Sequence, residues 1–511
     1  MTSFLHGDVL GERARLTPDK TALVWDPAGE AISYGELDRR AAALATALRR
    51  ELRLAKGDRF AVLSANRPEF FDAFFAAGKS GAIVVPLSTR LTTRELAGIL
   101  GDCSPTALLY GAEQREAAEA LRNTAGIRTF VALGEKARAD DPSLEELAAI
   151  FPDPERRVEA CDGEDPFALL YTSGTTGKPK GAIIPHRMIA WNAIQTALSW
   201  QLREDDVGPL FTPLYHAGGL TVFPTPLAAI GGTTVLLPAF DPPAVWRAIE
   251  RHGCTIVFGV PTIYRMLREA PEFDTADVSK VRWFISGGAP LPVSLVEDYR
   301  RRGVVLKQGF GMTEAGVNCF AMTAEDAIRK TGSVGKPMLW TKARIAAEAG
   351  REVPSGEAGE LELRGPHVCS GYWNDPEETR AAFRPDGWFA TGDLARRDED
   401  GFYFIAGRRK EIFISGGVNV SPLEVEAELL QHHDVSDVAV VGIPDPHWGE
   451  VGAAFVVRRP GSSTNAEALG AFLQGRLAKL KIPKRFDFVD SLPRTPYGKV
   501  VKAELVRRVR P

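Results

Sequence analysis

The sequence predicts an α/β protein with two domains, the larger one built from two related α/β halves and a small β-rich subdomain. Its 511 residues are too many for a single hydrophobic core. Apolar strand-like runs alternate with helical patterns in residues 8–110, and a similar order recurs in residues 210–260. The residue pattern changes after Gly332 and again near Gly407, which indicates further structural units.

The first α/β half begins with a helix over residues 37–52, where Leu37, Leu44 and Leu48 share one face at helical spacing. Further elements alternate as in a buried parallel sheet. We expect strands at 59–64, 81–87 and 107–110, and helices at 68–79 and 93–100.

The second half repeats this order of elements. We expect strands at 210–213, 234–237 and 255–260, and helices at 222–230 and 243–251. Two readings stay open: an internal duplication that gives two halves facing each other, or the ordinary likeness of any two α/β segments.

The rest of the chain predicts a β-rich subdomain and a separate small domain. Short strands at 360–363 and 387–390 follow Gly332, and a charged stretch begins at Gly407. The small domain should contain a helix at 422–431, a strand at 437–441 and a helix at 466–480. We expect a large domain over 1–406, a hinge at 407–411 and a mobile small domain over 412–511.

Bulk composition excludes several classes of function. A net charge of −4, with 44% hydrophobic and 25% charged residues, indicates a soluble globular protein without an electrostatic footprint for nucleic acid. Five scattered cysteines argue against a structural zinc site and fit a reducing compartment. The sequence shows no signal peptide and no apolar run near the ~20 residues of a membrane span, so we expect a cytoplasmic protein.

Residues 171–181, Tyr-Thr-Ser-Gly-Thr-Thr-Gly-Lys-Pro-Lys-Gly, join two apolar runs that read as strands. A loop rich in Gly, Ser and Thr offers free backbone N–H groups and hydroxyls to an anion, and its lysines add charge. It is not a Walker A loop, because Pro179 follows Lys178 where that motif needs Ser or Thr. The loop therefore predicts a phosphate site of another kind.

Other polar groups follow predicted strands in the same manner. His216 comes directly after one strand, and a glycine pair at 287–288 follows another. Residues 308–314 offer an aromatic ring, a hydroxyl and a carboxylate suited to Mg²⁺. Asp393 could chelate two vicinal hydroxyls, as a ribose presents them, and Lys499 lies on a turn near the end of the chain.

Together and in this order, these stretches resemble the adenylate-forming enzymes, which include acyl-CoA synthetases, adenylation domains of peptide synthetases and luciferases. The resemblance covers nearly the whole chain, and its details are most similar to bacterial fatty-acyl-CoA synthetases. Gly407-Arg408 resembles the family's motif at the domain junction, and residues 414–426 resemble its post-hinge stretch.

The resemblance implies the adenylate-forming fold and the cofactors ATP, Mg²⁺ and coenzyme A. It implies that Phe310 stacks on adenine, Thr313 contacts the α-phosphate, and Lys499 bridges that phosphate and the acid. Catalytic roles would belong to Lys499, Glu314, Thr175 and His216, with Thr175 and Glu314 at the metal. The full ATP-binding set is Thr172, Ser173, Gly174, Thr175, Thr176, Lys180, Gly288, Ala289, Pro290, Gln308, Gly309, Phe310, Thr313, Asp393, Arg408, Lys410 and Lys499.

For the acid, the resemblance implies a pocket bordered by His216, Gly218, Val222, Gly288 and Gly311, with Trp191 as a further wall residue. Lys410 matches the family's hinge residue. Three positions depart from the common pattern: Phe310 replaces tyrosine, Gly407 replaces aspartate, and Ile414 replaces a second lysine of luciferases and plant coumarate ligases. The last departure argues against luciferase-like oxidation and, less strongly, against the plant-type aryl ligases.

These features predict an acid–CoA ligase that forms AMP, with a medium- or long-chain fatty acid as the favoured substrate. The alternatives are an aryl- or hydroxycinnamoyl-CoA ligase, a stand-alone enzyme that loads a carrier protein, and a non-catalytic descendant. The intact Lys499, Glu314 and Asp393 weigh against the last. The oligomeric state stays open, with a homodimer as one candidate.

Overall fold

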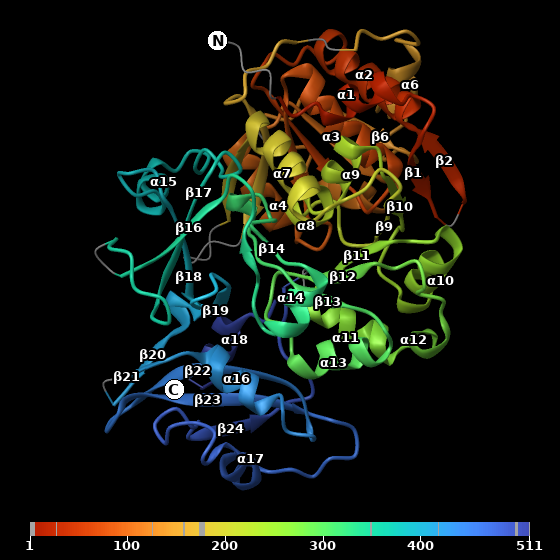
Figure 1. The fold of residues 1–511 in the computed structure, drawn as a ribbon. Coiled ribbons are helices and arrows are strands. Elements are labelled where there is room, and N and C mark those ends of the chain that lie inside the picture. The colour runs from red at the N-terminus through yellow and green to blue at the C-terminus, as the bar shows by residue number, and fades with distance from the viewer. Residues whose placement is uncertain are drawn as a thin grey trace.

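A computed structural model of the chain describes residues 6–26, 28–124, 126–156, 159–172, 179–347, 350–416, 418–495 and 499–509. Figure 1 shows the α/β halves in red to green, the β-rich subdomain in teal and the C-terminal domain in blue at the bottom of the view. Within the described segments, no helix combines the length and the apolar composition needed to cross a membrane.

The first half holds a six-stranded sheet in the order β6-β5-β3-β4-β7-β8, parallel except for the antiparallel pair β7-β8. Its strands are β3 (Arg59–Leu63), β4 (Ile83–Leu87), β5 (Ala107–Gly111), β6 (Thr129–Leu133), β7 (Pro166–Thr172) and β8 (Lys180–Pro185). The helices in this part are α1 (Val9–Leu16), α2 (Tyr34–Arg50), α3 (Pro68–Ser80), α4 (Thr93–Cys103), α5 (Arg115–Ala120), α6 (Leu144–Ala149) and α7 (His186–Ser199). The predicted strands and helices of this half are confirmed.

Helices cover both faces of this sheet, because successive strand residues point to opposite sides. Phe60 and Val62 of β3 belong to one apolar core, which includes Phe70 and Phe74 of α3. The intervening Ala61 and Leu63 belong to the core on the other face, with residues of α4. The carboxyl ends of the strands stay free of this packing and can carry a site.

The second half repeats the strand order of the first. Its strands are β1 (Thr21–Trp25), β2 (Glu30–Ser33), β9 (Val207–Leu210), β10 (Thr233–Leu236), β11 (Ile256–Gly259), β12 (Trp283–Ser286) and β13 (Leu306–Gln308). Sheets β2-β1-β10-β9 and β11-β12-β13 adjoin, since Thr255 before β11 donates its N–H to Val207 O at 2.8 Å. The order β10-β9-β11-β12 then matches β4-β3-β5-β6, which favours the internal duplication.

The helices of the second half are α8 (Ala217–Thr221), α9 (Pro224–Ile230), α10 (Pro242–His252), α11 (Pro261–Glu269), α12 (Glu272–Thr275) and α13 (Val293–Arg301). The helix predicted at 222–230 is α9, which begins two residues later because Pro224, without an N–H, is favoured in the first turn of a helix. One expectation was wrong in its position. The strand predicted at 210–213 lies earlier, at Val207–Leu210.

The β-rich subdomain predicted after Gly332 is an antiparallel sheet in the order β16-β17-β18-β19. Its members are β16 (Lys342–Ala346), β17 (Ala358–Arg364), β18 (Phe389–Arg397) and β19 (Tyr403–Arg408), preceded by β14 (Phe320–Ala321), α14 (Ala324–Arg329) and β15 (Lys336–Pro337). Helix α15 (Pro376–Ala382) lies between β17 and β18. The strand predicted at 387–390 is the start of the longer β18.

The C-terminal domain has its own sheet and core. It comprises β20 (Phe413–Ser415), β21 (Val418–Val420), α16 (Pro422–Leu429), β22 (Val435–Asp445), β23 (Gly449–Arg458), α17 (Ala466–Leu473), β24 (Arg485–Phe488) and α18 (Lys502–Val509). The predicted helix at 466–480 ends seven residues early in the structure, at Leu473, because Gln474 is extended and Gly475 has φ +78°. Between β19 and β20 the chain passes from one sheet to another, so the predicted hinge falls at this crossing.

Candidate active site

The predicted phosphate loop is the turn of the antiparallel hairpin β7-β8, whose last pair is Thr172 opposite Lys180. Ser173, Gly174, Thr175 and Thr176 lie outside the described residues, so their roles stay predictions. Alongside β8, residues 371–373 add a short pairing: Ile183 N donates to Gly371 O at 2.9 Å, and Trp373 N donates to Gly181 O at 2.8 Å. This pairing brings Tyr372 to the hairpin.

Lys180 already has an anionic partner in this structure. Its Nζ lies 2.7 Å from Glu378 Oε2, and the side chain is 12% exposed. The ammonium also lies 5.8 Å from the centre of the Tyr372 ring. An arriving phosphate would therefore compete with Glu378 for this lysine.

Glu314 lies in the short 3₁₀ turn Thr313–Ala315 and is buried. The hydrogen-bond partners of its carboxylate are neutral hydroxyls. Its Oε1 accepts from Tyr372 Oη at 3.1 Å and more weakly from Thr172 Oγ1 at 3.4 Å. Burial, with the Glu314 charge nearby, raises the pKa of Tyr372, so its hydroxyl stays a donor. Among the described residues no cation pairs directly with Glu314, and a buried carboxylate of this kind fits a hard divalent cation such as Mg²⁺.

Asp393 and Arg408 lie opposite each other on β18 and β19. Arg408 Nε lies 3.0 Å from Asp393 Oδ1, and the aspartate is 5% exposed. Burial raises the pKa of Asp393, while Arg408 and Lys499 oppose that rise.

Lys499 belongs to the C-terminal domain yet lies within the electrostatic field of the large domain. The residue is exposed to solvent, but the protein groups around its ammonium displace water, and this desolvation and the Arg408 charge lower its pKa, while Asp393 and Glu314 act in the opposite direction. Its backbone closes a small hairpin, since Thr495 N donates to Lys499 O at 2.7 Å. The structure therefore brings Lys499 near Asp393, Arg408 and Glu314, and the roles assigned to them stay predictions.

Residues predicted for adenine lie where β12 and β13 end. Gly309 N donates to Ser286 O at 2.7 Å, so the two loops that follow these strands adjoin. Gly288 has φ +77°, which L side chains rarely adopt. Ala289 and Pro290 continue this loop, Gln308 ends β13, and Phe310 is half-buried and meets Phe320 edge-on at 5.8 Å.

Except for Gly288, which lies in the loop after β12, the predicted acid-pocket residues come from two segments, one around α8 and one after β13. His216 caps α8, where its Nδ1 faces Gly218 N at 3.5 Å, and burial together with Lys499 lowers its pKa to about 3. A Cβ on Gly311 would lie 1.8 Å from Val317 O, so only glycine fits there. Val222 is buried, and its carbonyl accepts from Asn318 Nδ2 at 3.1 Å. The residue predicted as a further wall, Trp191, packs against Trp340 at 5.2 Å.

Sequence reasoning missed several residues of this site. Tyr372 and Glu378 lie on a segment almost 200 residues after the phosphate hairpin, without a motif of their own. Asn192, Gln195 and Thr196 of α7 form a buried polar stripe at helical spacing, which in a sequence looks like a solvent-facing surface.

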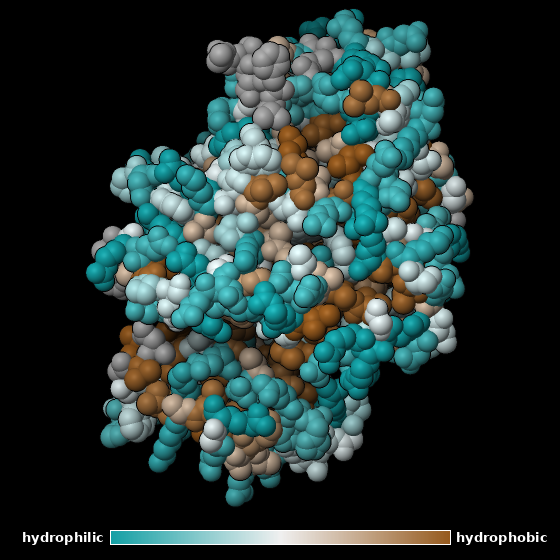
Figure 2. Space-filling view, viewed as in Figure 1, coloured by the Kyte–Doolittle hydropathy of each residue, from teal (hydrophilic) through white to brown (hydrophobic). Residues whose placement is uncertain are grey.

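The predicted hinge residue, Lys410, lies in the 3₁₀ turn Arg409–Glu411, and burial and the Arg408 charge lower its pKa. On this face a hollow separates the C-terminal domain from the large domain, and it contains apolar as well as polar residues (Figure 2).

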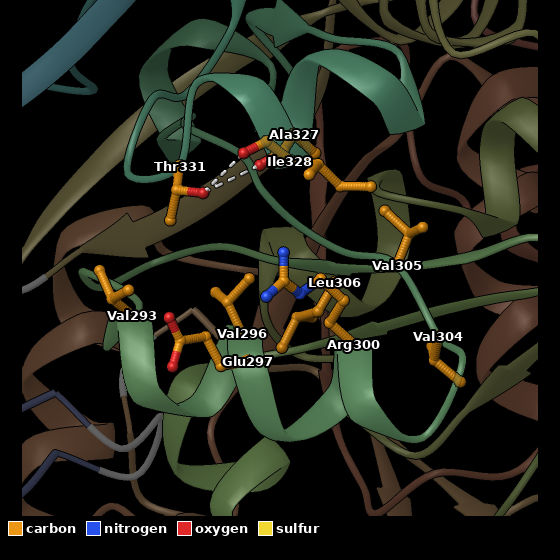
Figure 3. A pocket seen from close by; sticks show the side chains of 10 residues that line it. All are labelled: Val293, Val296, Glu297, Arg300, Val304, Val305, Leu306, Ala327, Ile328 and Thr331. Carbon is orange, nitrogen blue, oxygen red and sulfur yellow. Dashed lines mark hydrogen bonds between the residues drawn. The ribbon is translucent and has the colours of Figure 1, made fainter.

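A second hollow lies outside this site, between α13 and the segments around β13 and α14 (Figure 3). Apolar side chains of Val293, Val296, Leu306 and Ile328 line it, together with Glu297 and Arg300. It contains none of the predicted site residues, so we do not assign it to the active site.

Comparison with known proteins gives two family matches. The model described as AMP-binding enzyme matches residues 10–373, and that of the AMP-binding enzyme C-terminal domain matches residues 424–499. A feruloyl-CoA synthase of Amycolatopsis sp is 41% identical over 97% of both chains. The long-chain-fatty-acid–CoA ligase FadD13 of Mycobacterium tuberculosis is 34% identical over 98% of this chain and 97% of its own. ATP-bound MatB from Rhodopseudomonas palustris superimposes with a TM-score of 0.90 at 34% identity, over 98% of this chain and 99% of its own.

Proposed function

The chain belongs to the AMP-binding enzyme family and is an AMP-forming acid–CoA ligase that uses ATP, Mg²⁺ and coenzyme A, and we propose that its acid is an aromatic carboxylic acid of the hydroxycinnamate type. The observation that carries the proposal is a group of buried polar side chains on α7 and at Asn318, which contact the segment of the predicted pocket residue Val222. This choice differs from the fatty acid that the sequence favours.

In the first half-reaction, a carboxylate oxygen of the acid attacks the α-phosphorus of ATP, and the bond to pyrophosphate breaks. Two anions must approach each other, so a cation has to lie between them. Lys499 supplies that charge, and Asp393 with Arg408 orients the ribose. Glu314 would hold Mg²⁺, which offsets charge on the phosphates when bound.

In the second half-reaction, the thiol sulfur of coenzyme A attacks the acyl carbon and its proton leaves to water. The bond from that carbon to AMP breaks, and AMP departs. His216 is neutral at physiological pH, because its pKa is about 3, and it borders the acid next to Lys499. A neutral imidazole there lets the thiol pass without forming an ion pair.

Buried amides contact the segment of Val222, one of the predicted pocket residues, and a fatty chain would need no such polar groups there. Asn318 Nδ2 donates to Val222 O and to Thr196 Oγ1, both at 3.1 Å. Gln195 Nε2 donates to Asn318 O at 3.2 Å. The network joins α7 to the segment of Val222 and to the loop that holds Asn318, and so places buried polar groups beside two predicted pocket segments.

Asn192 adds an unmet acceptor to this network. Its Nδ2 donates to Thr221 O at 2.7 Å, but its buried Oδ1 has no hydrogen-bond partner among the described residues. That oxygen would lie 3.2 Å from a Cβ on Gly316, between the two loops of the pocket. A buried unpaired acceptor costs about 1–3 kcal/mol, and a phenolic hydroxyl could satisfy it.

The relatives support this choice without deciding it. The feruloyl-CoA synthase is more similar to this chain than FadD13 is, at 41% against 34% identity. The likeness to FadD13 and the glycine-rich pocket wall keep a fatty acid as the second candidate.

A substrate panel tests the proposal. Purified protein would be assayed for acid-dependent CoA ester formation with ferulate, 4-coumarate, cinnamate, benzoate, acetate and fatty acids of increasing length. We expect the highest kcat/KM with a hydroxylated cinnamate. Faster turnover of long-chain fatty acids would contradict the proposal and support the second candidate.

The variant Asn192→Leu sharpens the same test. Loss of one neutral hydrogen bond should lower kcat/KM for 4-coumarate by about three- to tenfold, with a smaller change for cinnamate, which lacks the hydroxyl. Equal losses for both acids would remove Asn192 from the recognition of the phenol.

A further inference from the structure

Two anchors hold the hairpin that carries Lys499. At one end, Arg494 Nη2 donates to Asp437 Oδ2 of β22 at 2.5 Å. At the other end, Lys502 Nζ lies 2.8 Å from Glu426 Oε1 and 3.0 Å from Glu411 Oε2. Both anchors lie on the C-terminal side of Lys410, so they fix the hairpin within the small domain and leave its orientation toward the large domain undetermined.

Asp437 has a second cationic partner, which belongs to the large domain. Arg265 Nη1 lies 3.6 Å from Asp437 Oδ2, with side-chain exposures of 29% and 16%. Among the ion pairs of the described residues, it alone joins the chain beyond the predicted hinge to the chain before it. Arg265 lies on α11, which begins next to the end of β11, while the adjoining strand β12 leads into the predicted adenine loop.

We propose that Asp437 is a positioning residue for adenylate formation: it couples Arg265 of the large domain to Arg494 at the base of the Lys499 hairpin. The ion pair holds the small domain in the orientation that faces Lys499 toward Asp393 and Glu314. The ion pair between Arg265 and Asp437 does not involve the acid, so the inference holds whichever acid the protein uses.

Because the Arg265–Asp437 ion pair joins the two domains, it should influence the rate of only one of the two half-reactions. If the small domain rotates about residues 407–411 after adenylation, as the sequence predicts, Asp437 must leave Arg265. Loss of the pair should then disfavour the adenylating orientation and leave the other orientation unaffected.

The test measures the two half-reactions separately, with the acid that wild-type protein turns over fastest. Arg265→Met should slow acid-dependent ATP–pyrophosphate exchange about two- to fivefold, since a partly exposed ion pair contributes modestly. Thioester formation from supplied acyl adenylate should be unchanged, and KM for ATP should stay at the wild-type value. Arg265→Lys, which keeps the charge, should recover most of the exchange rate.

Asp437→Asn should reproduce the selective loss, and the double variant with Arg265→Met should be no slower than Asp437→Asn alone. Glu428→Gln is the matched control, because Glu428 pairs with Arg476 entirely inside the small domain, at 3.3 Å. Equal loss of both half-reactions, additive single effects or a raised KM for ATP in Arg265→Met would overturn the proposal. So would an unchanged exchange rate.

Discussion

Lys180 and Lys499 lie in very different electrostatic surroundings, although the sequence assigns both lysines to ATP. Lys180 on β8 is paired with Glu378 at 2.7 Å, so its charge is balanced before any ligand binds. Lys499 has no ion-pair partner within the described part of the chain, and desolvation by the protein groups around its ammonium, together with the nearby Arg408 charge, lowers its pKa. The comparison teaches that a lysine kept without a counter-ion can respond to a developing anion, whereas a paired lysine first has to exchange partners.

The largest effect should come from removal of the unpaired lysine. Lys499→Ala should lower the rate of acid-dependent ATP–pyrophosphate exchange by about 10²–10³, because a preorganised charge at the reacting phosphate is lost. Thioester formation from supplied acyl adenylate should continue at close to the wild-type rate. If both half-reactions fell equally, Lys499 would not be specific to adenylation.

The pH dependence of adenylation should reveal the same lysine. Only the protonated ammonium neutralises the two anions, and its lowered pKa means that the proton is lost at lower pH than from an ordinary lysine of pKa 10.5. In exchange assays, kcat/KM for the acid should therefore begin to decline with rising pH at a pH below 10.5. Beyond the pKa of Lys499 the decline should be about tenfold per pH unit. In Lys499→Arg the alkaline fall should disappear, since arginine stays charged; an identical profile in both proteins would assign the limb to another group.

The smallest effect should come from the partner of the paired lysine. Glu378→Gln removes the competing carboxylate from Lys180, so KM for ATP should fall a few-fold, consistent with a partly exposed ion pair. Titration of initial rates with ATP measures this change, with the neighbouring exposed Glu377→Gln as control. A higher KM in Glu378→Gln would mean that Glu378 orients Lys180 for binding.

The sequence predicted the framework of the site well, for a physical reason. Glycine-rich loops and polar residues directly after buried strands mark the ends of parallel strands, where a site can form. Glu314 follows the parallel strand β13 in this way, whereas Asp393 and Arg408 lie on the antiparallel pair β18-β19 and Lys499 on a C-terminal turn, so tertiary packing brings these three to Glu314. The resemblance to adenylate-forming enzymes supplied the roles that spacing alone could not.

The partners of these residues could not be predicted, because long-range packing chooses them. Tyr372 reaches Glu314 only because its segment pairs with β8. The polar face of α7 is buried because α8 and the loop at Asn318 cover it, and the sequence pattern of α7 alone does not show this. Similarly, the link between Asp437 and Arg265 depends on the arrangement of two domains that share no local sequence signal.

One measurement tests the account most directly: product analysis of purified protein with ATP, Mg²⁺ and a hydroxycinnamate, with and without coenzyme A. The account predicts acid-dependent pyrophosphate release in both cases, and stoichiometric AMP and hydroxycinnamoyl-CoA under multiple turnover only when coenzyme A is present. Absence of acid-dependent pyrophosphate with every acid of the panel would contradict it.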